Sequence, residues 1–164
     1  FWAFAWAGGQ ALARYILDNR DICARRPVLD FASGSGLVAI AAALSGAERV
    51  TASDIDGYAE AAIGLNAAAN DVQLEISGND LIGQDFGWQV VLAGDAFYEK
   101  PLADRLLSWF RALKARGATI LIGDPGRTYL PKDALRECAL YDVAVTRSLE
   151  DQDIKKTRVW QLED

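Results

Sequence analysis

The sequence predicts an α/β fold built on a doubly wound, mostly parallel β-sheet, and two observations support this. Short runs rich in β-branched residues alternate with helical patterns along most of the 164-residue chain, which is typical of βαβ units. The central runs are apolar at consecutive positions, as expected for strands that helices cover on both faces. Ligands of such folds bind outside the carboxyl ends of the strands, so we expect the functional residues there.

The individual elements follow from periodicity. Five segments are expected to form the parallel strands: Val28–Phe31, Arg49–Ser53, Val72–Ile76, Val90–Ala93 and Thr119–Ile122. Helical spacing or an alanine-rich composition predicts helices around Leu12–Ile16, Leu37–Ser45, Tyr58–Ala69 and Leu102–Leu113.

The C-terminal part breaks this alternation. Tyr141–Arg147 and Thr157–Leu162 are predicted to be two further strands, joined by the charged segment Ser148–Lys156. That segment leaves no room for a crossover helix, so the two strands should pair antiparallel as a hairpin. Because no repeat, low-complexity tract or linker interrupts the chain, we expect residues 1–164 to form a single domain.

Composition narrows the class of protein. The chain is 51% hydrophobic, but no apolar run reaches the ~18–20 residues that a membrane-spanning helix needs. It opens at Phe1 and contains no methionine, so we expect upstream residues to be missing. A cytoplasmic location is expected, or the mitochondrial matrix if a missing segment is a targeting peptide. Cys23 and Cys138 lack metal-ligand spacing and are expected to be free thiols.

Two further features of composition limit the chemistry. The chain contains no histidine, which excludes His-based triads and the commonest zinc ligand. The net charge is −6, with no Lys/Arg cluster, so nucleic acid is disfavoured as a partner. An acidic domain suits a basic acceptor such as a lysine-bearing loop, although the charge also fits a role in solubility alone.

The strongest local signal is a strand that runs into a glycine loop and then a helix. Ser33, Gly34 and Gly36 form the loop, where glycine lets a ligand approach the backbone. A dinucleotide site would have G-x-G-x-x-G here, with Ala39 at the third glycine position. However, Asp30 precedes the loop on the strand, where its carboxylate would repel a pyrophosphate. It would instead attract the ammonium of a cationic amino-acid ligand such as S-adenosylmethionine.

Polar residues also follow the second and third strands. Asp54, Ile55 and Asp56 come at the end of the second strand, where a carboxylate can accept both ribose hydroxyls of an adenosine. Asp54 is the better candidate for that contact, and Asp56 is expected to cap the next helix. After the third strand, Asn79 or Asp80 is placed to meet the adenine amino group, although a simple turn also fits this segment.

These residues resemble a known family. Asp30-x-x-x-Gly34-x-Gly36 together with Asp54 is similar to the class I, or seven-β-strand, S-adenosylmethionine-dependent methyltransferases. The resemblance implies a Rossmann-like methyltransferase fold with sheet order 3-2-1-4-5-7-6 and the last strand antiparallel. It implies S-adenosyl-L-methionine as cofactor, S-adenosyl-L-homocysteine as product and no metal. It also implies that Trp6, before a helix over Gly8–Leu17, packs near the cofactor.

The sequence departs from the family pattern in two places. The first glycine of the usual loop is Ala32, which we expect to be tolerated because the next residues make the sharp turn. The tryptophan that many relatives carry after the third strand is absent, and Leu81 and Ile82 are expected to supply an apolar floor instead.

A second resemblance concerns the acceptor. Asp95-Ala96-Phe97-Tyr98 looks like the D-x-x-Y motif of the protein-lysine methyltransferases in this class, and Gly94 before it is assigned to the cofactor site. The stretches Gly94–Asp104, Leu121–Arg127 and Thr157–Trp160 are similar to the methyltransferases that act on the β subunit of electron transfer flavoprotein. The resemblance therefore implies a protein-lysine N-methyltransferase with that subunit as its protein substrate.

We expect methyl transfer to depend on orientation, because the nucleophile must lie ~3 Å from the methyl group and in line with it. Asp95 is predicted to orient the acceptor ammonium and to take its proton through water, while Tyr98 lines the channel. The alternative is that Asp95 is a helix cap and Tyr98 a core residue. Asp124 and Arg127 form either the acceptor rim or an ordinary Pro-Gly turn.

Other functions remain open at this point. A small-molecule N-methyltransferase would use the same cofactor half. A nucleotide-dependent oxidoreductase of similar fold is disfavoured by Asp30, and a module that binds cofactor without chemistry is disfavoured by the presence of both Asp95 and Tyr98. The sequence does not indicate an oligomeric state.

Overall fold

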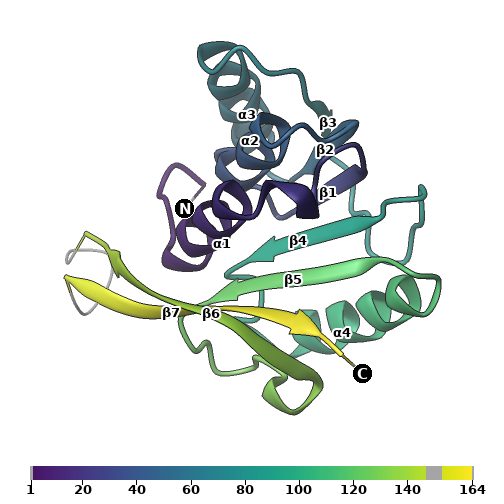
Figure 1. Cartoon of the computed structure of the whole chain (residues 1–164), viewed down its shortest axis with the longest axis vertical. Helices are drawn as coiled ribbons and strands as arrows, with labels where there is room; N and C mark the ends of the chain where they lie inside the picture. The colour runs from purple at the N-terminus through teal and green to yellow at the C-terminus, as the bar shows by residue number, and fades with distance from the viewer. Residues whose placement is uncertain (1, 147–152, 164) are drawn as a thin grey trace.

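The structure is a computed structural model, and it describes residues 2–146 and 153–163. Seven strands form one sheet in the order β3-β2-β1-β4-β5-β7-β6 (Figure 1). Their bounds are β1 Pro27–Phe31, β2 Arg49–Ser53, β3 Glu75–Ser77, β4 Val90–Gly94, β5 Thr119–Asp124, β6 Leu135–Ala144 and β7 Ile154–Leu162. Strands β1 to β5 are mutually parallel, and β7 runs antiparallel to both β5 and β6. The predicted fold class, strand order and C-terminal hairpin are confirmed.

Four α-helices are described: α1 Ala7–Asp18, α2 Leu37–Leu44, α3 Gly57–Ala69 and α4 Lys100–Ala115. Two short 3₁₀ helices, η1 Arg20–Ile22 and η2 Lys132–Ala134, precede β1 and β6. Asp56 is the N-cap of α3, and its side chain accepts a hydrogen bond from the amide of Tyr58, as predicted. Among the described helices the longest has 16 residues, and none is long and apolar enough to cross a membrane.

Both faces of the central strands are buried. Successive residues point to opposite faces of a strand, so β4 sends Val90 and Leu92 into one apolar cluster and Val91 and Ala93 into the other. The first cluster also contains the apolar faces of α1 and α2, and the second that of α4. This arrangement explains why the central strands are apolar at consecutive positions.

Three strands begin three or more residues from their predicted starts: β3, β6 and β7, the last at Ile154 and not at Thr157. Residues 72–74 were expected in β3 but lie outside it, because the chain there ends α3: Asp71 has φ 53° and the amide of Val72 donates to the carbonyl of Ala67. Strand β6 begins six residues before the predicted Tyr141. A bulge between Glu137 and Ala139 shifts its register against β7, which breaks the alternation that would have revealed the strand. The predicted end at Arg147 lies outside the described residues.

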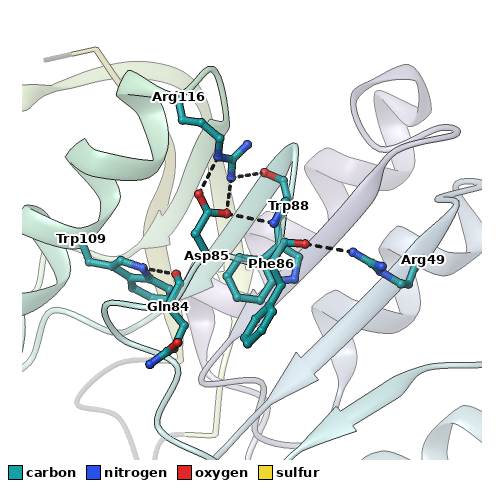
Figure 2. Close-up of polar contacts among 8 residues, drawn as sticks. Arg49, Gln84, Asp85, Phe86, Trp88, Trp109 and Arg116 are labelled. Atoms are coloured by element: carbon teal, nitrogen blue, oxygen red, sulfur yellow. Dashed lines mark hydrogen bonds and ion pairs between the residues drawn. The ribbon is translucent and has the colours of Figure 1, made fainter.

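No helix lies between β3 and β4, and the loop 78–89 connects these two strands instead. Figure 2 shows how the loop is held. Arg116 donates to both carboxylate oxygens of Asp85 at 2.7 and 2.9 Å and to the Trp88 carbonyl at 2.8 Å, and Trp109 Nε1 donates to the Gln84 carbonyl at 2.8 Å. Trp88 is 1% exposed and fills the space beneath the loop.

Candidate functional site

The glycine loop after β1 turns sharply through three residues with positive φ. Ala32 has φ 54°, Gly34 has φ 61° and Gly36, the N-cap of α2, has φ 90°. We expect alanine to be tolerated here on the ground that the following residues make the sharp turn, and that ground is wrong. The turn begins at Ala32 itself, in a conformation that costs roughly 1–2 kcal/mol for a residue with a Cβ.

Asp30 lies beneath this loop and is 1% exposed. Its Oδ2 accepts hydrogen bonds from Ser33 Oγ at 2.6 Å and from the amide of Ala39 at 3.0 Å. Burial raises the pKa of Asp30 to about 7, an effect that these two hydrogen bonds partly offset. A cation placed beside Asp30 would therefore recover the cost of ionising a buried carboxyl group.

Asp54 joins two loops at the ends of neighbouring strands. Its Oδ2 accepts from the amide of Gly34 at 2.9 Å, and its Oδ1 accepts from the amide of Asp56 at 3.0 Å. Since each carboxylate oxygen has two acceptor sites, both oxygens can still accept from hydroxyl groups in the cavity. Asp54 thus shapes the glycine loop as well as presenting a charge.

The residues after β3 form a turn. Asp80 accepts from the amide of Ile82 at 3.0 Å and pairs with Arg105 of α4 at 3.0 Å. These hydrogen bonds lower the pKa of Asp80, so it stays ionised. The expected apolar floor divides in two, because Ile82 lines the cavity whereas Leu81 packs in the core with α4.

The first turn of α1 rests directly on the ends of β4 and β5. A Cβ on Gly8 would overlap the carbonyl oxygen of Gly123, and one on Gly94 would come within 2.9 Å of Gly9 Cα. Real Cβ atoms do not approach backbone so closely, so glycine is required for this contact. We assigned Gly94 to the cofactor site, and it does line the cavity. Packing of α1 against β4, however, explains why this position has no side chain.

Asp95 follows β4 and is already bonded on both carboxylate oxygens. Its Oδ2 accepts from the amide of Gly9 in the first turn of α1 at 2.9 Å, and its Oδ1 pairs with Arg127 at 2.8 Å. The guanidinium of Arg127 also lies 5.5 Å from the centre of the Trp6 ring. Burial raises the pKa of Asp95, and Arg127 opposes this increase. Asp95 therefore caps α1, and not the helix that follows it in sequence.

Tyr98 and Asp124 occupy different environments. Tyr98 is 53% exposed and lines the cavity, so the alternative that it is a core residue is wrong. Asp124 is 1% exposed and does not line the cavity. Its Oδ1 accepts from the amides of Gly126 and Arg127, both at 2.6 Å. The turn interpretation therefore holds for Asp124. Arg127 does not line the cavity either, but its side chain pairs with Asp95, which does.

A cavity of about 330 Å³ lies at the carboxyl ends of the strands, a size typical of small-ligand sites. It brings together all the predicted site residues except Gly36: Trp6, Asp30, Ser33, Gly34, Asp54, Ile55, Asn79, Asp80, Gly94, Asp95 and Tyr98.

Sequence reasoning missed four notable lining residues: Trp2, Phe4, Leu102 and Arg105. The aromatic stretch at the start of the chain was a visible signal for the first two. Leu102 was placed only by its helical spacing. Nothing in the sequence indicated that Arg105 of α4 reaches back 25 positions to Asp80.

The chain resembles known proteins over almost its whole length. The electron transfer flavoprotein β subunit lysine methyltransferase of Xenopus laevis is 38% identical over 170 residues, covering 99% of this chain and 69% of the relative. The protein of the same name from Danio rerio is 39% identical, covering 98% of this chain and 65% of the relative. The chain belongs to this family of lysine methyltransferases. It spans about two thirds of the length of these relatives.

Two more distant similarities concern the cofactor side of the site and the fold. The family model of ribosomal protein L11 methyltransferase (PrmA) matches residues 10–94. This match includes the glycine loop and ends directly before Asp95. Magnesium protoporphyrin IX methyltransferase from Synechocystis, solved with bound S-adenosylmethionine, superposes with a TM-score of 0.65 at 14% identity, covering 94% of this chain and 78% of that one. This likeness supports the fold.

Proposed function

We propose that this chain transfers a methyl group from S-adenosylmethionine to a lysine ε-amino group of the electron transfer flavoprotein β subunit. The observation that carries the proposal is a likeness to lysine methyltransferases of that name over 99% of the chain. The acceptor-side residues Asp95 and Tyr98 lie outside the L11 methyltransferase match. The substrate is therefore inferred from the relatives that match the whole chain.

The residues of the cavity fit the cofactor chemically. Asp30 offers a buried carboxyl group to an amino-acid ammonium, and Asp54 offers a carboxylate to ribose hydroxyls. Because Asp80 already binds Ile82 and Arg105, we assign the adenine contact to Asn79. Trp6, Ile55 and Ile82 supply apolar lining. When bound, the cofactor supplies an electrophilic methyl group on a sulfonium.

The remaining requirement is a neutral amine held in line with that methyl group. A lysine amine ordinarily has a pKa of about 10.4, and a cavity of low dielectric constant and a nearby positive charge both lower it. Asp95 is positioned to orient the entering ammonium and to receive its proton through water. Tyr98, at the exposed edge of the cavity, is positioned to line the path of the lysine side chain.

The test is intact-protein mass spectrometry of the purified β subunit after incubation with S-adenosylmethionine and the enzyme. Wild type should add mass in steps of one methyl group. Asp95→Asn keeps an oxygen for the Gly9 amide but removes the charge, and it should slow methylation ~10²- to 10⁴-fold, the range typical of a lost proton acceptor. Tyr98→Phe should be milder.

Calorimetry of cofactor binding separates the two halves of the site. Both variants should bind S-adenosylhomocysteine with wild-type affinity, because neither side chain is assigned a cofactor contact. Equal methylation by wild type and Asp95→Asn would contradict the role of Asp95. Cofactor binding by wild type without methylation of the β subunit would contradict the substrate. If the enzyme is incubated with a cell extract and S-adenosylmethionine that carries a labelled methyl group, entry of the label into small molecules would favour a small-molecule N-methyltransferase.

A further inference from the structure

Asp95, which lines the acceptor side of the cavity, already pairs with a cation from the protein itself. Asp95 is 9% exposed, and its Oδ1 forms an ion pair with Arg127 at 2.8 Å, in which the side chains are 21% and 8% exposed. The other oxygen, Oδ2, is bonded to the amide of Gly9. A guanidinium therefore already supplies the positive charge beside Asp95 that an incoming ammonium would supply.

The groups around Arg127 have the chemistry of a general cation site. A carboxylate provides a charge-assisted hydrogen bond, and an aromatic face provides cation–π attraction within about 6 Å of the ring centre. Arg127 lies 5.5 Å from the centre of the Trp6 ring while it pairs with Asp95. An alkylammonium could satisfy the same two groups.

We propose that Arg127 is a placeholder for the acceptor lysine, and that the lysine ammonium replaces the Arg127 guanidinium between Asp95 and the Trp6 ring when the substrate binds. This inference rests on the proposed function for the identity of the incoming cation. The exchange conserves charge, because one cation leaves as another arrives. Asp95 is thus never left buried without a counter-charge, a state that is strongly destabilising.

The turn that carries Arg127 has the parts that such an exchange needs. Asp124 accepts from the amides of Gly126 and Arg127, which fixes the backbone of the turn without using the Arg127 side chain. A second hollow, of about 570 Å³, lies between α4 and the segment 126–134. Arg127 lines this hollow, which therefore has room to receive the displaced guanidinium.

The proposal is tested by filling the vacated position with a small ammonium. In Arg127→Ala, n-butylammonium, which has the length of a lysine side chain, should bind beside Asp95 and raise Tm, because a ligand that binds only the folded state stabilises it. We expect its apparent affinity, from the concentration dependence of Tm, to exceed that for wild type by at least about tenfold. Uncharged n-butanol should not reproduce the effect.

Two matched variants check that the position is specific. Arg127→Ala combined with Asp95→Asn lacks the carboxylate and should not respond. Arg116→Ala also removes an arginine paired with an aspartate, Asp85, but that pair is 36% and 42% exposed and lies away from the cavity. It should respond no more than wild type. Equal responses of wild type, Arg127→Ala and the double variant would overturn the proposal.

Failure of the proposed function would be visible separately, because the butylammonium measurement needs neither cofactor nor protein substrate. If Arg127→Ala is unfolded, refolding by n-butylammonium supports the proposal. Arg127→Gln is then tested as the second variant, and its failure to respond beyond wild type overturns it. With an active enzyme, Arg127→Ala should lower KM for the β subunit while leaving the affinity for S-adenosylhomocysteine unchanged. An unchanged KM would count against displacement.

Discussion

Cofactor affinity should depend on pH through Asp30. This carboxyl group is 1% exposed, and burial raises its pKa to about 7. The ligand ammonium can bind Asp30 fully only when the carboxyl group is ionised, so binding lowers the pKa of Asp30 and releases a proton. Affinity should therefore be high above pH 7 and fall as pH drops below it.

The magnitude follows from the fraction of Asp30 that is ionised. With a pKa of about 7, about half of the molecules are ionised at pH 7 and about one tenth at pH 6. Well below pH 7, the dissociation constant should rise about tenfold per pH unit, or about 1.4 kcal/mol. The amino group of the ligand ordinarily has a pKa of about 8, so the measurements should stay below pH 8.

The assay is isothermal calorimetry with S-adenosylhomocysteine between pH 5.5 and about 7.5, in buffers of different ionisation enthalpy that report proton release. The chain has no histidine, so no imidazole titrates in this range. Burial raises the pKa of Asp124 to about 6, but Asp124 does not line the cavity, so Asp124→Asn should keep the wild-type slope. Asp30→Asn should bind S-adenosylhomocysteine more weakly, and its affinity should no longer depend on pH in this range. A flat wild-type profile, or the same slope in Asp30→Asn, would refute the reasoning.

Three further predictions concern the frame of the site. Asp54→Ala should weaken S-adenosylhomocysteine ~10- to 100-fold by calorimetry, or ~1.5–3 kcal/mol, and near-native affinity would contradict the ribose contact. Gly9→Ala should be neutral or stabilising by up to ~1 kcal/mol, because the new Cβ would meet only an ordinary contact at 3.8 Å. Gly8→Ala should lower Tm, because its Cβ would overlap a backbone carbonyl of β5. Equal Tm values for the two variants would disprove this packing. In urea unfolding, Trp109→Phe should cost ~1 kcal/mol more than Trp88→Phe. Trp109 donates to the loop backbone, whereas Trp88 Nε1 has no hydrogen-bond partner among the described residues. The reverse order would refute this.

The sequence by itself determined the elements whose signal is local. Strand periodicity, the glycine loop and the carboxylates at strand ends depend on neighbours within a few residues. Asp30, Asp54 and the N-cap Asp56 could therefore be placed before the fold was known. The antiparallel pairing of the two C-terminal strands followed from the length of the segment between them, which is too short for a crossover helix.

Bounds were less predictable where a neighbouring element competes for the same residues. Val72 looks like a strand residue, but its amide is used to end α3. The start of β6 was hidden because the bulge at Glu137 and Ala139 interrupts the period of two. Such interruptions depend on which strand lies alongside, and the local sequence pattern does not indicate which strand that is.

Only the tertiary structure decided what the acceptor-side residues touch. Asp95 and Arg127 are 32 positions apart, and they meet because β4 and β5 pair in parallel with Gly94 beside Gly123. The same pairing brings α1, and with it Trp6, onto the ends of both strands. The sequence could name Asp95 as a carboxylate at the right edge of the sheet. It could not show that the carboxylate is already bound, because contacts between distant residues are set by strand order and register.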